Sequence, residues 1–184
     1  MSYTDQYLQV VINPAKMGEV KLIANRITKN KPRYEAIQAI TGCPWWMVGC
    51  IHQMEAGGKK DPFKGHLHNG DPLTARTVNV PAGRPLGNPP FTWEQSAEDA
   101  INYMSKTNPI WRARIGWDFE SCLVKLEAYN GMGYKKKGVP TPYLWSYTQF
   151  YTSGKYVADR KYDPNKVSKQ PGVCAVMKVL NIVP

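Results

Sequence analysis

A stretch dense in turn-forming residues lies between positions 61 and 91 and limits the folds that this chain can adopt. Its sequence, DPFKGHLHNGDPLTARTVNVPAGRPLGNPP, is rich in glycine, proline, asparagine and aspartate. Asn69-Gly70 favours a tight hairpin turn, and the β-branched residues of 74–80 are typical of a strand. We therefore predict a small β-hairpin and loop inserted at about 61–91.

The segments on both sides of this insertion have the periodicity and the end signals of α-helices. Proline marks several predicted starts, glycine marks several ends, and Thr92 and Asp118 are predicted N-caps. The predicted helices cover residues 17–29, 32–42, 44–55, 92–105, 118–131 and a short piece from 142. The apolar segment 173–182 is a helix or a strand, and we favour a helix. The fold class is therefore mainly α (α+β), with one domain over residues 1–184.

Composition restricts the partners and the compartment of this 184-residue chain. Its net charge of +10 indicates an anionic partner or surface, such as nucleic acid, acidic lipid or bacterial cell wall. No apolar run approaches the ~18 residues of a membrane span. The start, MSYTDQYLQV, lacks the pattern of a signal peptide, so we expect synthesis in a cytoplasm without export by the usual route. We expect the four widely spaced cysteines to be reduced, mostly buried thiols.

Glu55 is the first candidate for chemistry. It follows the apolar run 43–51 at the end of a predicted helix, and Gly57-Gly58 comes directly after it. Burial disfavours the ionised form of a carboxyl, so Glu55 there would hold a proton at neutral pH and act as a general acid. The glycines would let a bulky substrate approach. The alternative is that Glu55 merely ends the helix and points to water.

Two separated motifs give the chain a resemblance to a known family. Glu55-Ala56-Gly57-Gly58 is followed some seventy residues later by Ala128-Tyr129-Asn130-Gly131. In this order they resemble the lysozyme-like superfamily, in which lytic transglycosylases and goose-type lysozymes carry a glutamate at a helix end and, later, Ala-Tyr-Asn-Ala-Gly. The stretches HLHNGDPLTARTVNVPAGRP, PYLWS and YTSGKYV also resemble cell-wall lysins of phages and bacteria. The resemblance covers about residues 43–160 and implies a lysozyme-like helical domain with a small hairpin beside the active-site cleft.

The chain departs from the transglycosylases because it lacks their Gly-Leu-Met-Gln type motif. Its hairpin with Asn69-Gly70-Asp71 instead resembles phage-type lysozymes, in which an aspartate and a threonine follow the acid in a small sheet. This resemblance implies Asp71 as the water-orienting base, with Thr77 assisting and Thr74 as an alternative to it. Asp71 is also a good turn residue on structural grounds alone.

The same resemblance implies a set of substrate-binding residues. Tyr129 and Asn130 would flank the acid, with the asparagine amide bonding an N-acetyl or hydroxyl group. Tyr134 and Trp145 are candidates for stacking on sugar rings, and His66 is a further substrate-binding candidate. We expect Glu127 to face solvent or to pair with a lysine.

Three rival functions stay open. His52, His66 and His68, with Asp71 or Glu55, suggest a metallohydrolase, although the common metal-binding spacings are missing. The charge and the aromatic residues suggest nucleic-acid binding, although no motif of that class is present. The third rival is a catalytically inactive structural module, for instance within a phage tail.

The sequence thus predicts a muramidase-type glycosidase that cleaves the glycan strand of bacterial peptidoglycan. We expect no cofactor, no metal, no nucleic-acid partner and no stable insertion into a membrane. The missing signal peptide suits a lysin released through a holin-dependent route or carried in a virion, and acting at the periplasm or cell wall. A lytic transglycosylase of the same fold is the alternative.

Overall fold

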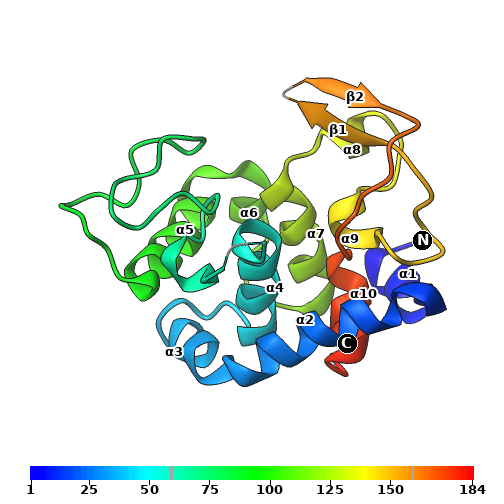
Figure 1. The fold of residues 1–184 in the computed structure, drawn as a ribbon, viewed down its shortest axis with the longest axis horizontal. Helices are drawn as coiled ribbons and strands as arrows, with labels where there is room; N and C mark the ends of the chain where they lie inside the picture. Colours follow the sequence, from blue (N-terminus) through cyan, green and yellow to red (C-terminus); the bar gives the residue numbers. More distant parts are fainter. Residues whose placement is uncertain (59, 159) are drawn as a thin grey trace. The chain divides into compact units, whose positions relative to one another are not determined.

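The computed structural model describes residues 1–58, 60–158 and 160–184. Helices make up most of its regular structure, and the sheet in the described part has two antiparallel strands (Figure 1). The prediction of a mainly α chain with a small β element is therefore confirmed. The chain divides into two compact units, the first made of Met1–Thr28 and Asp118–Pro184 and the second of Lys29–Trp117. One domain over residues 1–184 stays a prediction.

The second unit contains the helix that carries Glu55. Its helical elements are α3 (Lys31–Thr41), α4 (Trp45–Ala56), η2 (Pro62–Lys64), α5 (Trp93–Thr107) and α6 (Pro109–Ala113). α3 packs against both α4 and α5 (Figure 1). The predicted end signals are present, because Gly42 ends α3 with a φ of 75°, and Thr92 and Gln95 form a reciprocal capping box at the start of α5.

The predicted strand at 74–80 is wrong, and so is the hairpin that it would form. Residues 65–91 are irregular apart from an isolated bridge between Gly65 and Pro72. The backbone N–H groups of Val78 and Asn79, one of which a two-stranded ladder would use, instead both donate to the carboxylate of Asp71. The segment is therefore organised by side chains rather than by a sheet.

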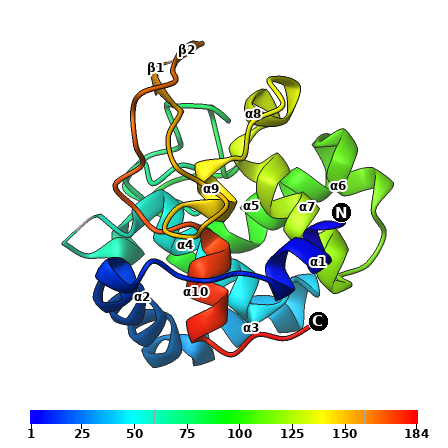
Figure 2. The same cartoon turned by 90° about the vertical axis from the view of Figure 1, so that its right-hand side faces the viewer.

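The first unit combines both ends of the chain. Its elements are α1 (Tyr3–Leu8), η1 (Pro14–Lys16), α2 (Met17–Lys29, whose last residue falls in the second unit), α7 (Phe119–Asn130), α8 (Gly133–Lys136), α9 (Pro142–Trp145), β1 (Lys155–Ala158), β2 (Lys161–Asp163) and α10 (Val173–Val179). α7 packs against α1 and α9, and α10 packs against α9 (Figure 2). All four cysteines are buried and unbridged, as predicted.

Five elements described in this unit were not predicted, namely α1, η1, α8, β1 and β2. α1 is only six residues long, although Ser2 and Asp5 form a capping box at its start. The strands β1 and β2 pair antiparallel, with Tyr156 opposite Tyr162. Their turn has no Asn-Gly or Asp-Gly signal, and Arg160 takes the left-handed conformation there with a φ of 58°.

Candidate functional site

Glu55 lies in the last turn of α4, on a helix that is otherwise mostly interior. Nine of the twelve residues of α4 are buried, and Glu55 is half-buried. Pro44 precedes the helix, and Gly57 caps its end by donating to the backbone oxygen of Gln53 at 3.0 Å. The Glu55 carboxyl therefore lies at the partly accessible end of a helix that is otherwise buried.

A close approach at Gly65 sets the loop of Asp71 against the end of α4. A Cβ atom placed on Gly65 would lie 3.4 Å from the Cβ of Ala56 and 3.0 Å from the backbone oxygen of Gly70. Ala56 directly follows Glu55, and Gly70 directly precedes Asp71. The end of α4, which carries Glu55, and the loop that carries Asp71 therefore both lie against Gly65.

Asp71 is the centre of a hydrogen-bonded loop. Its Oδ2 accepts the backbone N–H groups of Val78 at 2.8 Å and Asn79 at 2.9 Å, and the Asn69 amide at 3.1 Å. Its Oδ1 accepts the Asn79 side-chain amide at 2.8 Å. Burial alone would raise the pKa of Asp71, but these hydrogen bonds outweigh it and lower the pKa below its ordinary value. The carboxylate is therefore ionised at neutral pH.

Thr77 is buried and closes the next part of the loop. Its hydroxyl donates to the backbone oxygen of Pro81 and accepts the backbone N–H of Arg84 at 2.9 Å. The Thr77 N–H in turn donates to the Arg84 oxygen at 2.7 Å. The hydroxyl proton that would assist a water molecule is thus bonded to the loop itself.

His66 is fully buried, so its ring is not accessible to a ligand in this structure. Its Nδ1 lies 2.8 Å from the Ser96 hydroxyl, and its Nε2 lies 2.8 Å from the backbone oxygen of Ala75. Because a carbonyl oxygen only accepts, Nε2 carries a proton, and in the neutral ring Nδ1 then accepts from the Ser96 hydroxyl. His66 joins the loop to α5, which is a structural role.

In the first unit, two predicted substrate-binding residues line the same pocket. Asn130 is the exposed last residue of α7, and Tyr134 is buried on α8. Together with Tyr156, Lys137 and Arg160 they border a pocket of about 380 Å³. Tyr129 is half-buried next to Asn130. Since Glu55 belongs to the other unit, the predicted grouping of Glu55 with Tyr129 and Asn130 stays a prediction.

Trp145 is buried, so it does not present an open face for stacking on a sugar. Its ring lies nearly parallel to that of Tyr3, with centroids 6.3 Å apart, and packs edge-on against Phe150. The expectation for Glu127 is wrong, because this side chain is also buried and accepts a hydrogen bond from the Tyr3 hydroxyl. The buried face of α7 is wider than the sequence pattern indicates, and it includes charged side chains.

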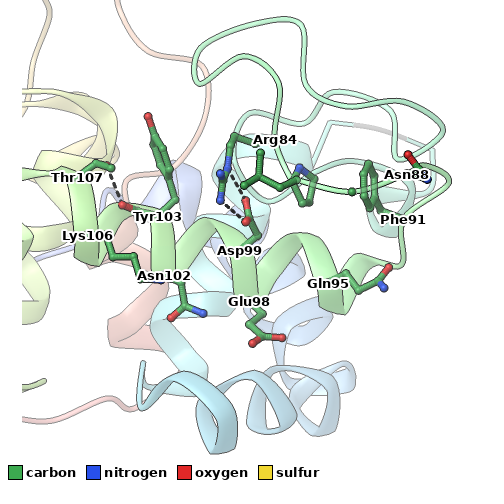
Figure 3. A pocket seen from close by; sticks show the side chains of 13 residues that line it. Arg84, Asn88, Phe91, Gln95, Glu98, Asp99, Asn102, Tyr103, Lys106 and Thr107 are labelled. Atoms are coloured by element: carbon green, nitrogen blue, oxygen red, sulfur yellow. Dashed lines mark hydrogen bonds and ion pairs between the residues drawn. The ribbon is translucent and has the colours of Figure 1, made fainter.

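The sequence did not identify a pocket of about 590 Å³ between α5 and the loop that follows Gly83 (Figure 3). Arg84 forms an ion pair with Asp99 there, and its Nε donates to Asp99 Oδ2 at 3.0 Å. The same oxygen lies 2.8 Å from Nε2 of His68. Burial lowers the pKa of His68 to about 4, although Asp99 opposes this shift. No motif marks these residues, because the loop brings them together across fifteen positions or more.

The remaining histidine also has a structural role. His52 is buried on α4, with Nδ1 2.9 Å from the Tyr34 hydroxyl and Nε2 3.0 Å from the backbone oxygen of Pro62. Within residues 1–58, 60–158 and 160–184, no three His, Cys, Asp or Glu side chains come together as a potential metal site.

None of the helices described is both long and apolar enough to cross a membrane. Comparison with known proteins finds no match for this chain among family models, curated proteins or solved structures.

Proposed function

We propose that the chain is a lysozyme-like glycosidase that cleaves the glycan strand of bacterial peptidoglycan, with Glu55 as the general acid. The observation that carries this proposal is the position of Glu55, half-buried in the last turn of the mostly buried α4. The C-terminal end of a helix carries partial negative charge, which disfavours an ionised carboxylate. Burial and helix end therefore both favour the protonated form that donates to the glycosidic oxygen.

Asp71 is proposed as the base that orients the attacking water. Its hydrogen bonds keep it ionised, and the contact at Gly65 brings its loop to the end of α4. Two carboxyl groups about 6.5–9.5 Å apart leave room for a water and invert the anomeric centre, whereas about 5–5.5 Å allows a covalent intermediate. With no base in reach, the sugar's own groups would close a ring, as in a lytic transglycosylase, which is the alternative of the same fold.

The test is cleavage of purified peptidoglycan by the Glu55→Gln variant. General acid catalysis contributes about 10²–10⁴-fold, so we expect a loss of that size with the fold intact by circular dichroism. Glu35→Gln is the matched control, because Glu35 is an exposed carboxylate of the same unit. Undiminished cleavage by the Glu55→Gln variant would refute the assignment.

The released products identify the reaction. Mass spectrometry should find new reducing ends for hydrolysis, whereas anhydro ends would indicate transglycosylation. New peptide amines would overturn the glycosidase proposal in favour of an amidase or peptidase. A chelator should leave cleavage unchanged, whereas loss of activity would favour the metallohydrolase.

A non-catalytic wall- or nucleic-acid-binding protein is the second candidate. Its support is the net charge of +10. Binding to the wall without release of any fragment would favour this candidate over an enzyme.

A further inference from the structure

The positive charge of the chain is concentrated in one part of the first unit. Residues 130–170 contain eight lysine and arginine residues and two aspartates, which gives +6 of the total charge of +10. Seven of the eight cations are exposed and the eighth, Lys155, is half-buried. They lie on and around α8 and the β1–β2 hairpin, and we call this region the cationic surface.

Three tyrosines hold α8 and the hairpin together. The ring of Tyr134 packs edge-on against Tyr156, with centroids 5.1 Å apart, and against Tyr162 at 6.2 Å. Tyr156 and Tyr162 pack against each other at 5.4 Å, and the Tyr156 N–H donates to the Tyr134 hydroxyl at 3.0 Å. The cations on these two elements are therefore held by a common aromatic core.

The tyrosines pack mainly within this core, and Tyr134 and Tyr156 also border the pocket. A Cβ on Gly133 would lie 2.9 Å from the Tyr156 hydroxyl, and the Tyr162 hydroxyl occupies the space beside Gly154. The Lys137 ammonium lies over the ring of Tyr162, 5.1 Å from its centroid. Binding of single-stranded nucleic acid depends on stacking of bases on open aromatic faces. This surface instead offers charge.

The 380 Å³ pocket lies within the cationic surface. Lys137 and Arg160 line it from α8's end and from the hairpin turn, and Asn130 adds an amide. None of its described lining residues is acidic. Two cations and an amide around one pocket are a suitable set of donors for a phosphate group.

We propose that the cationic surface binds a linear polymer of phosphodiesters, with one phosphate held by Lys137 and Arg160 in the pocket. The remaining exposed lysines extend beyond the pocket, which suits a chain of repeated charges rather than a single anion. The choice of a polyol-phosphate polymer of the bacterial wall, rather than nucleic acid, rests on the proposed function. The mutual packing of the three tyrosine rings agrees with it, because rings that pack on one another do not form a row of stacking platforms. Such binding would keep the enzyme at the wall between cleavage events.

The experiment measures binding of the whole chain to poly(glycerol phosphate) as a function of salt. Each Lys or Arg near an anionic surface contributes about fivefold in affinity, so Lys137→Ala/Arg160→Ala should weaken binding about 25-fold. The slope of log K against log salt should become shallower by about 0.7, the value for one phosphate contact of a single strand, because both cations hold the same phosphate. Lys21→Ala/Lys29→Ala removes the same charge from exposed positions on α2 and should change the affinity less than threefold.

Three results would overturn the proposal. The first is an equal loss of affinity in both double variants, which would mean that only bulk charge matters. The second is tighter binding to a single-stranded oligonucleotide of equal charge, which would identify nucleic acid as the ligand. The third is no binding at about 0.15 M salt. Because this polymer contains no glycosidic bond for Glu55 to cleave, Glu55→Gln should bind it normally, and failure here is distinguishable from failure of the proposed function.

Discussion

Asn79 binds Asp71 twice, with its backbone N–H on Oδ2 at 2.9 Å and its side-chain amide on Oδ1 at 2.8 Å. This double contact fixes the orientation of the carboxylate and folds residues 71–79 around it. Asp71 therefore shapes the loop whether or not it also activates a water molecule. Substitutions on the two sides of this contact can separate the two roles.

Asp71→Asn should lower the free energy of unfolding by about 2 kcal/mol, because an amide group replaces one of the two accepting oxygens. If Asp71 is the base, peptidoglycan cleavage at 25 °C should also fall by at least about 100-fold. Asn79→Ala loosens the same loop but keeps the carboxylate, and should lose less than tenfold. Equal losses in the two variants would show that Asp71 acts only through the loop.

His52 should make the protein less stable in mild acid. Burial lowers its pKa in the folded protein to about 4, whereas the unfolded chain binds that proton near pH 6.5. Between these values the unfolded state holds more protons, so the free energy of unfolding should fall by about 1.4 kcal/mol for each unit that the pH drops. Urea unfolding from pH 6.5 to 4.5 measures this slope.

The His52→Gln variant isolates this contribution from that of His68. It removes the titrating ring but keeps a polar group beside Tyr34 and Pro62. In this variant the free energy of unfolding should depend less steeply on pH, by about 1.4 kcal/mol per pH unit, than in the unchanged protein. Identical slopes would contradict the assignment of the acid sensitivity to His52.

Ser96→Ala should destabilise the second unit by about 1–3 kcal/mol. The Ser96 hydroxyl accepts the backbone N–H of Leu67 at 3.1 Å and bonds the buried ring of His66, so alanine would leave both groups unsatisfied. Ser105 is an exposed serine on the same helix. Ser105→Ala should change stability by less than about 0.5 kcal/mol in denaturant unfolding. Similar effects of the two substitutions would argue against the buried network.

Replacing glycine with alanine should lower the stability of the protein at Gly154 and raise it at Gly18. Gly154 has a φ of 97°, and the Tyr162 hydroxyl fills the space that a methyl group would need. Gly154→Ala should therefore cost at least about 2 kcal/mol. Gly18, on α2, has nothing within 4 Å of a new Cβ, and Gly18→Ala should stabilise by about 0.5 kcal/mol. Thermal unfolding of both variants tests the pair.

The elements that could be predicted from the sequence are those whose helix-start and helix-end residues lie within a few positions of the element. The proline before α4, the capping box of α5 and the glycine after α3 each act within a few residues, and the structure has all three. The loop at 61–91 was predicted as a hairpin because strand propensity is also read locally. What overrides it is the Asp71 carboxylate, which takes backbone donors seven and eight positions away.

Part of one pocket is likewise built from residues that are close in the sequence. Asn130 and Tyr134 lie four positions apart around Gly131, and they line one pocket. Arg84 and Asp99 are fifteen positions apart, and only the path of the loop brings them together. The ring of Trp145 stacks on that of Tyr3, which lies far away in the sequence, near the N-terminus. Contacts between residues so far apart in the sequence produce no periodic pattern from which they could be predicted.

Separate groups of hydrogen bonds, rather than a continuous β-ladder, hold the loop from 61 to 91 in place. Asp71 closes one turn, Thr77 closes the next, and His66 attaches the segment to α5. We expect a change at one of these contacts to reshape its own turn and to leave the packing of α3 against α4 and α5 in place. A few substitutions in this loop should therefore change the surface next to Glu55 while the helices that support the loop stay folded.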